Sequence, residues 1–429
     1  MNWLKRWRGE KMGKPNIRFK GYTEDWEQRK LGDFGKATGG TSIESEFSED
    51  GIYKVISIGS YSENSVYNDQ GIRAIKSDKT SNRVLNRNDL TMILNDKTTS
   101  GNIIGRVLLI EESGIYVYNQ RTERIEINLD EYDPVFLYEM LNAPNIREKI
   151  IKQAQGNTQI YVNWTAISLL EYMIPSKEEQ VKIGEYLHSI SNLITLHQRK
   201  YDETKKLKKC MLQKMFPKEG EKVPEIRFSG FTGDWKQRKL GEIVNRITRK
   251  NSKLISELPL TISAQQGLID QNEFFDKRVA SKDVSGYYLI KNGEFAYNKS
   301  TSNDAPWGAI KRLDRYENGV LSTLYIVFEI KDETLVNSDF LVAYYSTNLW
   351  YKGIHEIAAE GARNHGLLNI APTDFFKTKL KLPADIEEQQ EIGEYFKKID
   401  SLITFHQQKC DELKNIKKFM LQNMFVSEK

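Results

Sequence analysis

Side chains suited to hydrogen bonding with nucleic acid gather in two short segments, and each segment has a counterpart later in the chain. The first segment spans residues 95–102 (NDKTTSGN), with a counterpart at 298–304 (NKSTSND). The second spans 156–164 (GNTQIYVNW), with a counterpart at 361–365 (GARNH). Asn and Gln pair with adenine through two hydrogen bonds, Arg pairs with guanine, and Lys, Ser and Thr reach phosphates. The composition therefore suggests contacts with DNA.

The candidate DNA-contacting residues come from both halves of the chain. In the first half they are Lys97, Thr98, Thr99, Ser100, Asn102, Arg106, Asn157, Gln159, Tyr161 and Asn163. In the second half they are Lys299, Ser300, Thr301, Ser302, Asn303, Arg363, Asn364 and His365. The alternative is ordinary solvated turn chemistry, because Asn, Ser, Thr and Gly populate loops in any case. Composition alone leaves both interpretations open.

Catalytic and metal chemistry find little support in the sequence. It contains no G-x-x-x-x-G-K-[ST] phosphate loop and no Pro-Pro pair of the kind that methyltransferase motifs carry. Cys210 and Cys410 are the only cysteines and there are five histidines, too few for a cysteine zinc site. We therefore expect no catalysis by this chain, no metal site and no bound cofactor.

Charge and hydropathy set further bounds. The chain has 63 Lys and Arg against 59 Asp and Glu, so a polyanion site must come from local patches and not from the global field. No apolar run reaches the roughly 20 residues of a membrane helix. The basic segment 1–14 lacks the apolar stretch of a secretory signal. These features predict a cytoplasmic protein with no membrane partner.

An internal repeat organises the whole sequence. Residues 15–32 (PNIRFKGYTEDWEQRKLG) match residues 224–241 at 13 of 18 positions, an offset of 209. Residues 178–216 match residues 387–425 at 24 of 39 positions with the same offset. Between these blocks the similarity nearly vanishes. The pattern predicts one frame, made twice, that presents two different recognition surfaces.

The trailing block of each repeat has the pattern of a long helix. Ser176 with Glu179, and Asp385 with Glu388, have the spacing of capping boxes at the helix starts. The mostly apolar positions that follow the heptad steps of a coiled coil form its predicted seam, in which Thr204, Lys208 and Lys417 are imperfect. In the first block these positions are Ile183, Leu187, Ile190, Ile194, His197, Tyr201, Thr204, Lys208, Met211 and Met215. In the second block they are Ile392, Phe396, Ile399, Ile403, His406, Cys410, Leu413, Lys417, Met420 and Met424.

The charge distribution along the two helices favours antiparallel packing. Each begins with acidic residues and ends with lysines, so an antiparallel pair opposes the helix dipoles and sets unlike charges together. We expect Lys209 near Glu394 and Lys418 near Glu185. His197 and His406, the midpoints of the two blocks, would then meet at a pseudo-twofold axis. A metal or pH switch there is less favoured than a polar pair that fixes register.

The variable bodies between these blocks read as α+β domains. The first has strand patterns at Ile52–Gly59, Leu90–Asn95, Ile103–Glu111 and Ile115–Ile127, and then a helical stretch, Pro134–Gln155, with a break near Pro144. The second has strand patterns at Leu258–Ser263, Tyr287–Tyr297, Trp307–Leu313 and Val320–Ile330, and then a helical stretch, Ser338–Ala359. The order of elements is the same in both.

Three further features remain, and the first two allow two interpretations each. Trp26 and Trp235 are expected to anchor each body to its helix, although a Trp also stacks on bases. The lysines of 205–209 and 414–418 either follow DNA phosphates or simply solvate the helix ends. The two cysteines are expected to be structural thiols.

These features together resemble the specificity subunit of type I restriction–modification enzymes. The resemblance rests on the duplicated RF-x-GF/Y-x-x-DW-x-x-x-KLG lead-in, on the EEQ opening of each trailing helix, and on the alternation of variable and fixed blocks. It covers Pro15 to Phe425. The predicted parts are an N-terminal extension (1–14), target-recognition domain 1 (15–175), spacer helix 1 (176–217), target-recognition domain 2 (218–383) and spacer helix 2 (384–429).

The resemblance implies a function that the residues alone do not. It implies a non-catalytic subunit that reads a split, asymmetric target in double-stranded DNA, one half per domain. It implies two methyltransferase subunits and motor–nuclease subunits as partners, with S-adenosylmethionine, ATP and Mg only on those partners. Adenine methylation or restriction would be performed by the partners. The alternative is a coiled-coil scaffold that binds proteins without reading DNA.

Overall fold

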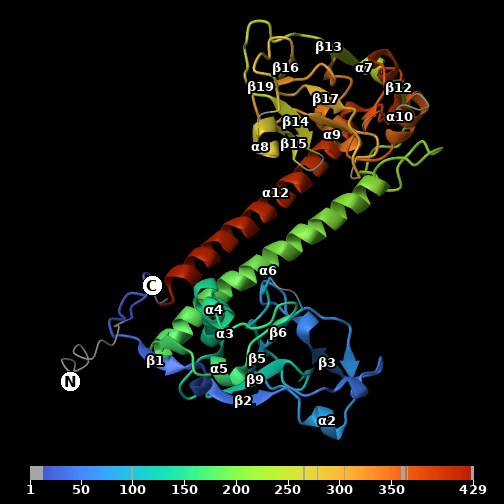
Figure 1. Ribbon diagram of the computed structural model, residues 1–429. Helices are drawn as coiled ribbons and strands as arrows, with labels where there is room; N and C mark the ends of the chain where they lie inside the picture. Colours follow the sequence, from blue (N-terminus) through green and yellow to red (C-terminus); the bar gives the residue numbers. More distant parts are fainter. Residues whose placement is uncertain are drawn as a thin grey trace. The chain divides into compact units, whose positions relative to one another are not determined.

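The computed structural model describes residues 13–97, 100–263, 266–277, 279–303, 305–358, 363–364 and 366–426 (Figure 1). The chain forms two compact units. Unit 1 comprises Met1–Gln198 and Gln408–Lys429, and unit 2 comprises Arg199–Gln407. This division cuts both long helices, whereas the predicted domain boundaries keep each helix whole. The predicted boundaries therefore stay a prediction. Within the described residues no helix is long and apolar enough to cross a membrane.

Unit 1 contains eleven strands among its described residues and a set of short helices. The strands are β1 (Glu27–Lys30), β2 (Gly35–Gly39), β3 (Tyr53–Ile56), β4 (Arg73–Ala74), β5 (Leu90–Ile93), β6 (Asn95–Asp96), β7 (Val107–Leu109), β8 (Tyr116–Tyr118), β9 (Thr122–Ile127), β10 (Ile160–Tyr161) and β11 (Glu171–Ile174). The helices are η1 (Leu31–Phe34), η2 (Glu44–Glu46), η3 (Ile58–Ser60), α2 (Asp78–Ser81), α3 (Pro134–Asn142), α4 (Pro144–Ile151), α5 (Trp164–Ile167) and the first part of α6 (Lys177–Lys214).

Unit 2 repeats this pattern with its own sequence. Its described strands are β12 (Lys236–Lys239), β13 (Val244–Ile247), β14 (Leu260–Ser263), β15 (Gly267–Asp270), β16 (Tyr288–Lys291), β17 (Phe295–Asn298), β18 (Ala309–Arg312), β19 (Asn318–Leu321), β20 (Ile326–Ile330), β21 (Arg363–Asn364), β22 (Leu367–Leu368) and β23 (Lys379–Leu382). Its helices are α7 (Leu240–Ile243), α8 (Gln271–Phe275), α9 (Ser338–Tyr344), α10 (Tyr351–Ile357), α11 (Pro372–Phe375) and the first part of α12 (Ile386–Asn423).

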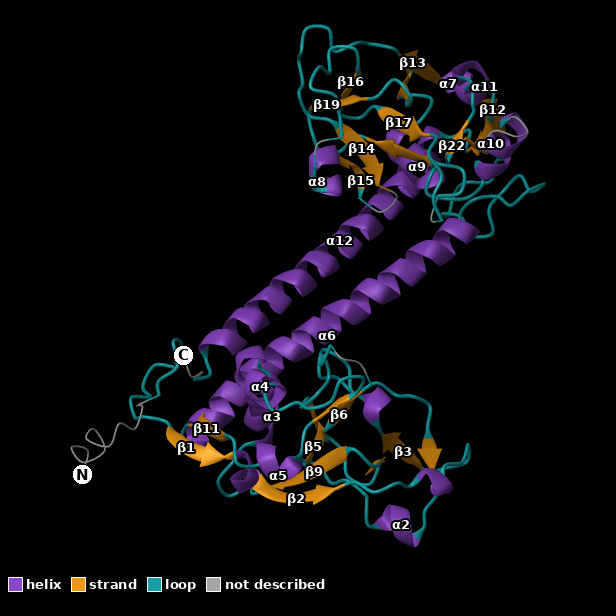
Figure 2. Ribbon diagram, viewed as in Figure 1, coloured by secondary structure: helices purple, strands orange, loops and turns teal. Residues whose placement is uncertain are grey.

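The central sheets of the two units have the same topology. In unit 1 four antiparallel strands lie in the order β2-β9-β5-β7, and in unit 2 the order β13-β20-β17-β18 is equivalent (Figure 2). Smaller sheets surround them, among them the antiparallel pairs β1–β11 and β12–β23. The predicted α+β class is confirmed, and the two bodies share one architecture although their sequences differ.

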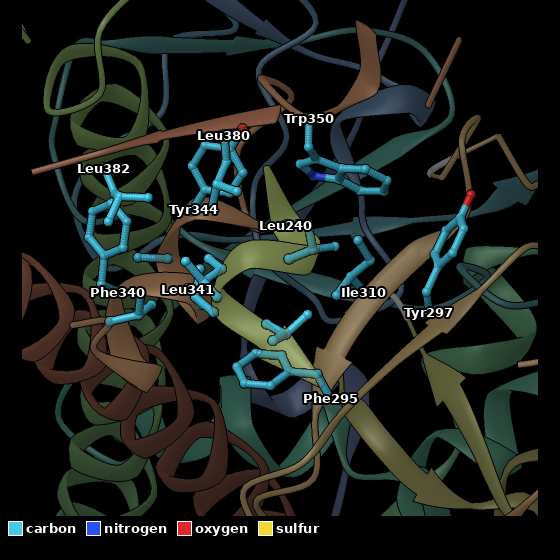
Figure 3. Packing of buried hydrophobic residues seen from close by; sticks show 14 of the residues in the cluster. Leu240, Phe295, Tyr297, Ile310, Phe340, Leu341, Tyr344, Trp350, Leu380 and Leu382 are labelled. Atoms are coloured by element: carbon cyan, nitrogen blue, oxygen red, sulfur yellow. The ribbon is translucent and has the colours of Figure 1, made fainter. Parts of the chain in front are cut away.

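Each central sheet packs against its helices through one apolar core. In unit 2 this core contains aromatic rings from the strands, from α9 and from the loop before α10 (Figure 3). The rings of Tyr297 and Phe375 stack at a centroid distance of 4.9 Å, and Phe340 lies 5.7 Å from Trp235. Trp26 and Trp235 are only 3% and 5% exposed, so the expectation that they lie in the core and not on a DNA-facing surface is confirmed.

A buried ion pair in each unit joins the lead-in to the start of a long helix. Arg18 Nε and Nη2 donate to the two carboxylate oxygens of Glu179 at 2.6 and 2.7 Å. Arg227 makes the same two bonds to Glu388 at 2.7 and 2.8 Å. Hydrogen bonding to the carboxylate raises the pKa of both arginines. In each unit, the Arg of the RF motif and the second Glu of the EEQ motif therefore form one bidentate ion pair.

This contact corrects the predicted capping boxes. Ser176 Oγ does accept from Glu179 N, at 3.4 Å, and Asp385 Oδ1 accepts from Glu387 N at 2.9 Å. The carboxylates of Glu179 and Glu388, however, turn to the arginines instead of back to the helix start. A guanidinium offers a carboxylate a stronger, charge-assisted pair of bonds than a backbone amide does.

The glutamine of each EEQ motif also holds the recognition body. Gln180 Oε1 accepts from the backbone N of Asp133, the residue that caps α3, at 2.9 Å. Gln389 Oε1 accepts from Asn337 N, at the cap of α9, at 3.0 Å. The short helix of each body thus begins at a fixed point on the long helix.

The long helices follow the predicted heptad pattern. Both α6 and α12 are 38 residues long, which is about 57 Å at 1.5 Å per residue. Every predicted seam residue is buried or half-buried, whereas Leu193 and Leu207, which lie off the seam, are exposed. The imperfect seam positions Lys208 and Lys417 are half-buried because each makes an ion pair.

Within each unit the two helices run antiparallel. In unit 1, Lys417 Nζ lies 2.6 Å from Ser191 Oγ, and Cys410 Sγ lies 3.6 Å from Gln198 Oε1. Residue numbers therefore rise along one helix as they fall along the other. In unit 2, Lys208 Nζ lies 2.5 Å from Asp400 Oδ1, and the Phe216 ring, just past α6, lies 6.0 Å from that of Phe396. The predicted direction is confirmed.

The predicted ion pairs between the helices are wrong in register. Glu394 pairs with Lys398 on its own helix at 2.9 Å, and Lys208, not Lys209, reaches the partner helix. Charge polarity fixes the direction of the pair, but apolar packing sets its register, because exposed ion pairs contribute little. His406 belongs to unit 2 and His197 to unit 1, so their predicted meeting stays a prediction.

Several strand predictions need correction. The predicted strand Tyr287–Tyr297 is two strands, β16 and β17, separated by a turn at Asn292 and Gly293, where Gly293 has a φ of 84°. Val320–Ile330 likewise contains the end of β19 and the whole of β20. The strands β1 and β12 were not predicted, because EQRK and KQRK are exposed on both faces and show no apolar alternation.

Candidate nucleic-acid interface

The two polar segments of unit 1 lie side by side. Strand β6 pairs with β10, so that Asp96 lies opposite Ile160 and Asn95 opposite Tyr161. Val162 N donates to Leu94 O at 2.9 Å and extends this pairing. More than fifty residues separate the segments in sequence, and the sequence did not predict their pairing. We call the surface formed by the described residues 95–97, 100–102 and 156–163 platform 1.

Unit 2 builds the same arrangement from other residues. Leu368 N donates to Lys299 O at 3.0 Å, and Thr301 N donates to Gly366 O at 2.7 Å. Ser300 forms an isolated bridge with Leu367. We call the surface formed by the described residues 298–303, 363–364 and 366–368 platform 2. In both units the first segment follows a central strand of the main sheet, β5 in one case and β17 in the other.

Most candidate contacts of platform 1 point to solvent. Tyr161 is 44% exposed, and the other exposed candidates are Lys97, Ser100, Asn102, Asn157, Gln159 and Asn163. Thr98 and Thr99 lie outside the described residues. An exposed ring beside exposed amides and a lysine offers both a stacking surface and hydrogen-bond donors. The platform therefore has the chemistry that contact with bases and phosphates needs.

The described part of platform 2 is smaller. Ser300, Ser302 and Asn303 are exposed, and Lys299 and Thr301 are half-buried. Burial lowers the pKa of Lys299. The structure describes Arg363 and Asn364 only as strand β21, without their side chains, and His365 lies outside the described residues.

Some predicted contacts hold the platforms together. Asn163 Oδ1 accepts from Thr165 N at 3.0 Å and so caps α5. Asn102 Nδ2 donates to Glu63 Oε1 at 2.7 Å. In platform 2, Thr301 Oγ1 donates to Gly366 O at 3.0 Å, and Ser302 Oγ accepts from Ala305 N at 3.2 Å. These side chains are expected to shape the platforms more than to read bases.

Two arginines support platform 1 from beneath. Arg106, a predicted DNA contact, donates to Asn102 O and to Ser65 Oγ, both at 2.9 Å. Arg147 on α4 was not predicted; its Nη1 donates to Gly101 O at 3.2 Å and to Ile104 O at 2.8 Å. Burial, and then the nearby charge of Arg106, lowers the pKa of Arg147 to about 10. Nothing in the sequence distinguishes Arg147 from an ordinary solvated helix residue.

The structure offers no metal centre within the residues it describes. No group of three or more His, Cys, Asp or Glu side chains there could hold an ion. Cys210 is half-buried and Cys410 buried, and both are free thiols. The buried His406 and the half-buried His197 lie on the predicted seam.

Comparison with known proteins assigns a family to this arrangement. The sequence matches the family described as type I restriction modification DNA specificity domain over residues 23–206 and again over residues 232–415. The chain belongs to this family. The two matches lie 209 positions apart, the offset of the internal repeat, so each copy of the frame carries one specificity domain. The resemblance inferred from the sequence is confirmed.

Individual relatives agree with this assignment. The chain is 27% identical over 194 residues to the type I restriction enzyme MjaVIII specificity subunit of Methanocaldococcus jannaschii. That match covers 44% of this chain and 45% of the relative, less than half of its length. The crystal structure of the type I restriction–modification system S subunit from M. genitalium covers 97% of this chain with a TM-score of 0.65 and 16% identity, and all of that chain is matched. The two proteins share a fold.

A second solved structure is less similar. The HsdS subunit from Thermoanaerobacter tengcongensis is 16% identical and covers 93% of this chain and 96% of its own, with a TM-score of 0.42.

Proposed function

We propose that this chain is the DNA-recognition subunit of a type I restriction–modification complex and reads a bipartite, asymmetric target. Platform 1 would read one half of the target and platform 2 the other. One observation carries this proposal: both units build the same two-segment platform on the same frame, from sequences that have diverged. To read two different half-sites, the two units need the same scaffold but platforms with different polar side chains.

The remaining roles belong to partner subunits in this proposal. Two methyltransferase subunits would bind the chain and modify adenine, and motor–nuclease subunits would join them for restriction. S-adenosylmethionine, ATP and Mg would bind to those partners. The chain itself would select the site, in the cytoplasm, without catalysing a reaction.

Methylation mapping tests the proposal directly. The chain is expressed with its methyltransferase partners, and methylated adenines are mapped across the genome. We expect a motif with two unlike halves and an unread gap between them. A complex that methylates without any such motif, or a chain that never binds DNA in the partner complex, would contradict the proposal.

Substitutions in the platforms assign the halves. Gln159→Ala should relax one half of the motif only, and Asn303→Ala the other half only, because a lost base contact costs about 1–3 kcal/mol of discrimination. Gln237→Ala, an exposed glutamine of the lead-in, is the matched control and should leave the motif unchanged. A change in both halves from one substitution would count against separate reading by the two units.

A coiled-coil scaffold without DNA readout is the competing outcome. Gel mobility of the partner-bound chain on random duplexes at low and moderate salt separates the two. A DNA reader binds with a steep salt dependence, because phosphate contacts release counterions. A scaffold leaves the duplex free at both salt concentrations.

A further inference from the structure

A lysine-lined groove adjoins platform 2 in unit 2. The cavity has a volume of about 570 Å³ and lies between α6, strand β18 and the segment Ala305–Gly308, which follows the platform residue Asn303 closely. Its charged lining consists of Lys205, Lys208, Lys209, Lys311 and Asp400. Four ammonium groups thus share one carboxylate.

That carboxylate is already engaged. Lys208 Nζ lies 2.5 Å from Asp400 Oδ1, whereas Lys205 donates to Tyr201 Oη at 3.2 Å and lies over its ring. Within the described residues, no hydrogen-bond or ion-pair partner lies in reach of Lys311 Nζ. Burial, and then the charge of Lys208, lowers the pKa of Lys311. Lys311 is half-buried, and the carboxylate of Asp400 opposes this lowering only in part while it pairs with Lys208. A partly desolvated ammonium group that has no salt bridge of its own is stabilised by an anion that pairs with it.

Unit 1 has no such group at the equivalent place. In unit 2, Lys311 lies opposite Ala296 of β17; in unit 1, the strand β7 is equivalent to β18, and Leu108 lies opposite Thr91 of β5. The equivalent sheet order makes Leu108 the counterpart of Lys311. Leu108 is buried and apolar. The unpaired lysine is therefore not part of the repeated frame but an addition in unit 2.

The lysine of unit 1 that corresponds to Lys208 also pairs with a more deeply buried carboxylate. Lys417, 209 positions after Lys208, lies 2.9 Å from Glu139 Oε2, a carboxylate that is 1% exposed. The positive groove is accordingly a property of one unit. A folding requirement would be expected to appear in both copies of the frame, so this difference suggests a ligand.

We propose that this groove binds a phosphate of the DNA backbone beside the half-site that platform 2 reads, with Lys311 as the central contact and Lys205 and Lys209 at its rim. The inference rests on the proposed function. DNA is favoured over a small anion because Ala305, in the lining of the groove, is hydrogen-bonded through its backbone to Ser302 of platform 2. A phosphate held there would fix the register of the duplex without reading its sequence.

The salt dependence of DNA binding tests this assignment. The full chain in complex with its methyltransferase partners is titrated with a duplex that carries its mapped motif, over a range of salt concentrations. Lys311→Met removes the charge and keeps a side chain suited to burial. We expect its slope of log K against log salt to fall by about 0.9, with roughly three- to tenfold weaker binding and an unchanged methylation motif. Lys311→Arg should restore the slope.

Two matched measurements separate a phosphate contact from a general loss of charge and from a loss of stability. Lys236→Met removes an exposed lysine of the same unit from the lead-in and should leave the slope unchanged. The thermal unfolding temperature of Lys311→Met should equal or exceed that of the unsubstituted chain, because a half-buried charge without a salt bridge is lost. A fall in stability would mean that Lys311 stabilises the fold, and would overturn the proposal.

The remaining outcomes are equally decisive. An unchanged slope for Lys311→Met overturns the phosphate contact while the proposed function stands. Inorganic phosphate could raise the unfolding temperature only when Lys311 is present, while the salt slope of DNA binding does not depend on Lys311. The groove would then be a small-anion site, and the proposed DNA phosphate contact would be overturned. Failure of the unsubstituted complex to bind any motif removes the proposed function, and this inference with it.

Discussion

Units 1 and 2 balance the same helix lysine in different ways. In unit 1, Lys417 contacts Glu139 of the recognition body, and Ser191 of the partner helix contributes only a hydroxyl. In unit 2, Lys208 contacts Asp400, which stands 209 positions after Ser191. The carboxylate has thus moved from the body in one unit to the helix in the other.

The counterpart of Glu139 shows that the exchange is complete. Glu139 lies six residues after Asp133, the cap of α3, and Ala343 lies six residues after Asn337, the cap of α9. Unit 2 therefore has Ala where unit 1 has Glu, and Asp where unit 1 has Ser. A half-buried lysine requires a counter-charge but not one from a particular element. The frame keeps its lysine while the bodies diverge around it.

The cavities facing the long helix also differ in charge between the units. In unit 1 a cavity of about 330 Å³ is lined by Glu111, Glu112 and His188, together with hydroxyl groups and apolar side chains. In unit 2 the corresponding region carries the lysine groove. Two bodies of the same architecture thus present opposite local charge, although the whole chain is close to neutral. The helix lysines 205, 208 and 209 have counterparts in Lys414, Lys417 and Lys418, so the residues of the bodies, Lys311 in one unit and Glu111 and Glu112 in the other, contribute much of the difference.

The largest effect is expected where the units agree. Glu179→Ala and Glu388→Ala each leave a half-buried arginine without its buried carboxylate, which costs at most about 3–5 kcal/mol. The loss should be larger for Glu388, because Trp235 Nε1 also donates to it at 3.3 Å. Hydrogen exchange should show that the first substitution loosens α3 and the second loosens α9.

Neighbouring glutamates provide the controls for this prediction. Glu178 and Glu387 precede the buried pair members directly and are exposed, so replacing either by Ala should change stability by less than about 0.5 kcal/mol. Equal losses from the buried and the exposed positions would show that the repeated ion pair does not hold the bodies.

The second prediction is that the stability of unit 1 depends on pH through a buried carboxyl group that unit 2 lacks. Burial raises the pKa of Glu123 in β9 to about 7, and the charge of Arg83 opposes this only in part. The protonated carboxyl is favoured in the folded state, so its contribution to stability is complete below about pH 4.5 and is lost as pH rises through 7. The equivalent residue in unit 2 is Ile326, since Met92 and Tyr297 are the matching strand partners.

Glu123→Gln isolates this effect. Between pH 5.5 and 8 the unsubstituted chain should lose about 2 kcal/mol more unfolding free energy than the variant does. Denaturant unfolding at both pH values measures the difference, and hydrogen exchange should confine it to unit 1. Parallel pH profiles for the two proteins would mean that Glu123 is already ionised in the fold.

The sequence predicted the frame well because the frame is repeated in it. Two copies of the lead-in and of the EEQ helix, at one offset, identify the positions that the two units share, and heptad spacing identifies the buried face of each helix. The direction of the helix pair followed from charge polarity. The register of the pair could not be predicted from charge, because it depends on the packing of apolar side chains such as Phe216 and Phe396.

The platforms were predicted only in part. Polar composition identified their segments, but the pairing of β6 with β10 joins two-residue strands that carry no periodic signal. The support from Arg147 also depends on tertiary contacts alone. The turn at Asn292 and Gly293, by contrast, has an Asn-Gly signal that was available in the sequence.

The third prediction exchanges the carboxylates between the units. Glu139→Ala leaves Lys417 with Ser191 alone and should cost about 1–3 kcal/mol, because a half-buried ammonium loses its charged acceptor. Adding Ser191→Asp copies the arrangement of unit 2 and should restore most of that loss. Unfolding of the single and double variants measures the coupling. If Ser191→Asp gives no recovery in the Glu139→Ala background, the two positions are not interchangeable sources of the counter-charge.

The smallest effect is expected at Asp400 itself. This carboxylate is 45% exposed, so Asp400→Asn should cost less than about 1 kcal/mol of stability, against the larger loss at the buried Glu139. The same substitution removes the one negative charge of the lysine groove. If the groove binds a phosphate, the partner-bound variant should therefore bind duplex DNA more tightly at low salt, with a steeper salt dependence. Ser191→Ala at the matching position of unit 1 removes no charge and should leave the DNA affinity unchanged. A stability loss at Asp400 as large as that at Glu139 would show that the ion pair stabilises both units equally. The two units would then differ only in where the carboxylate lies.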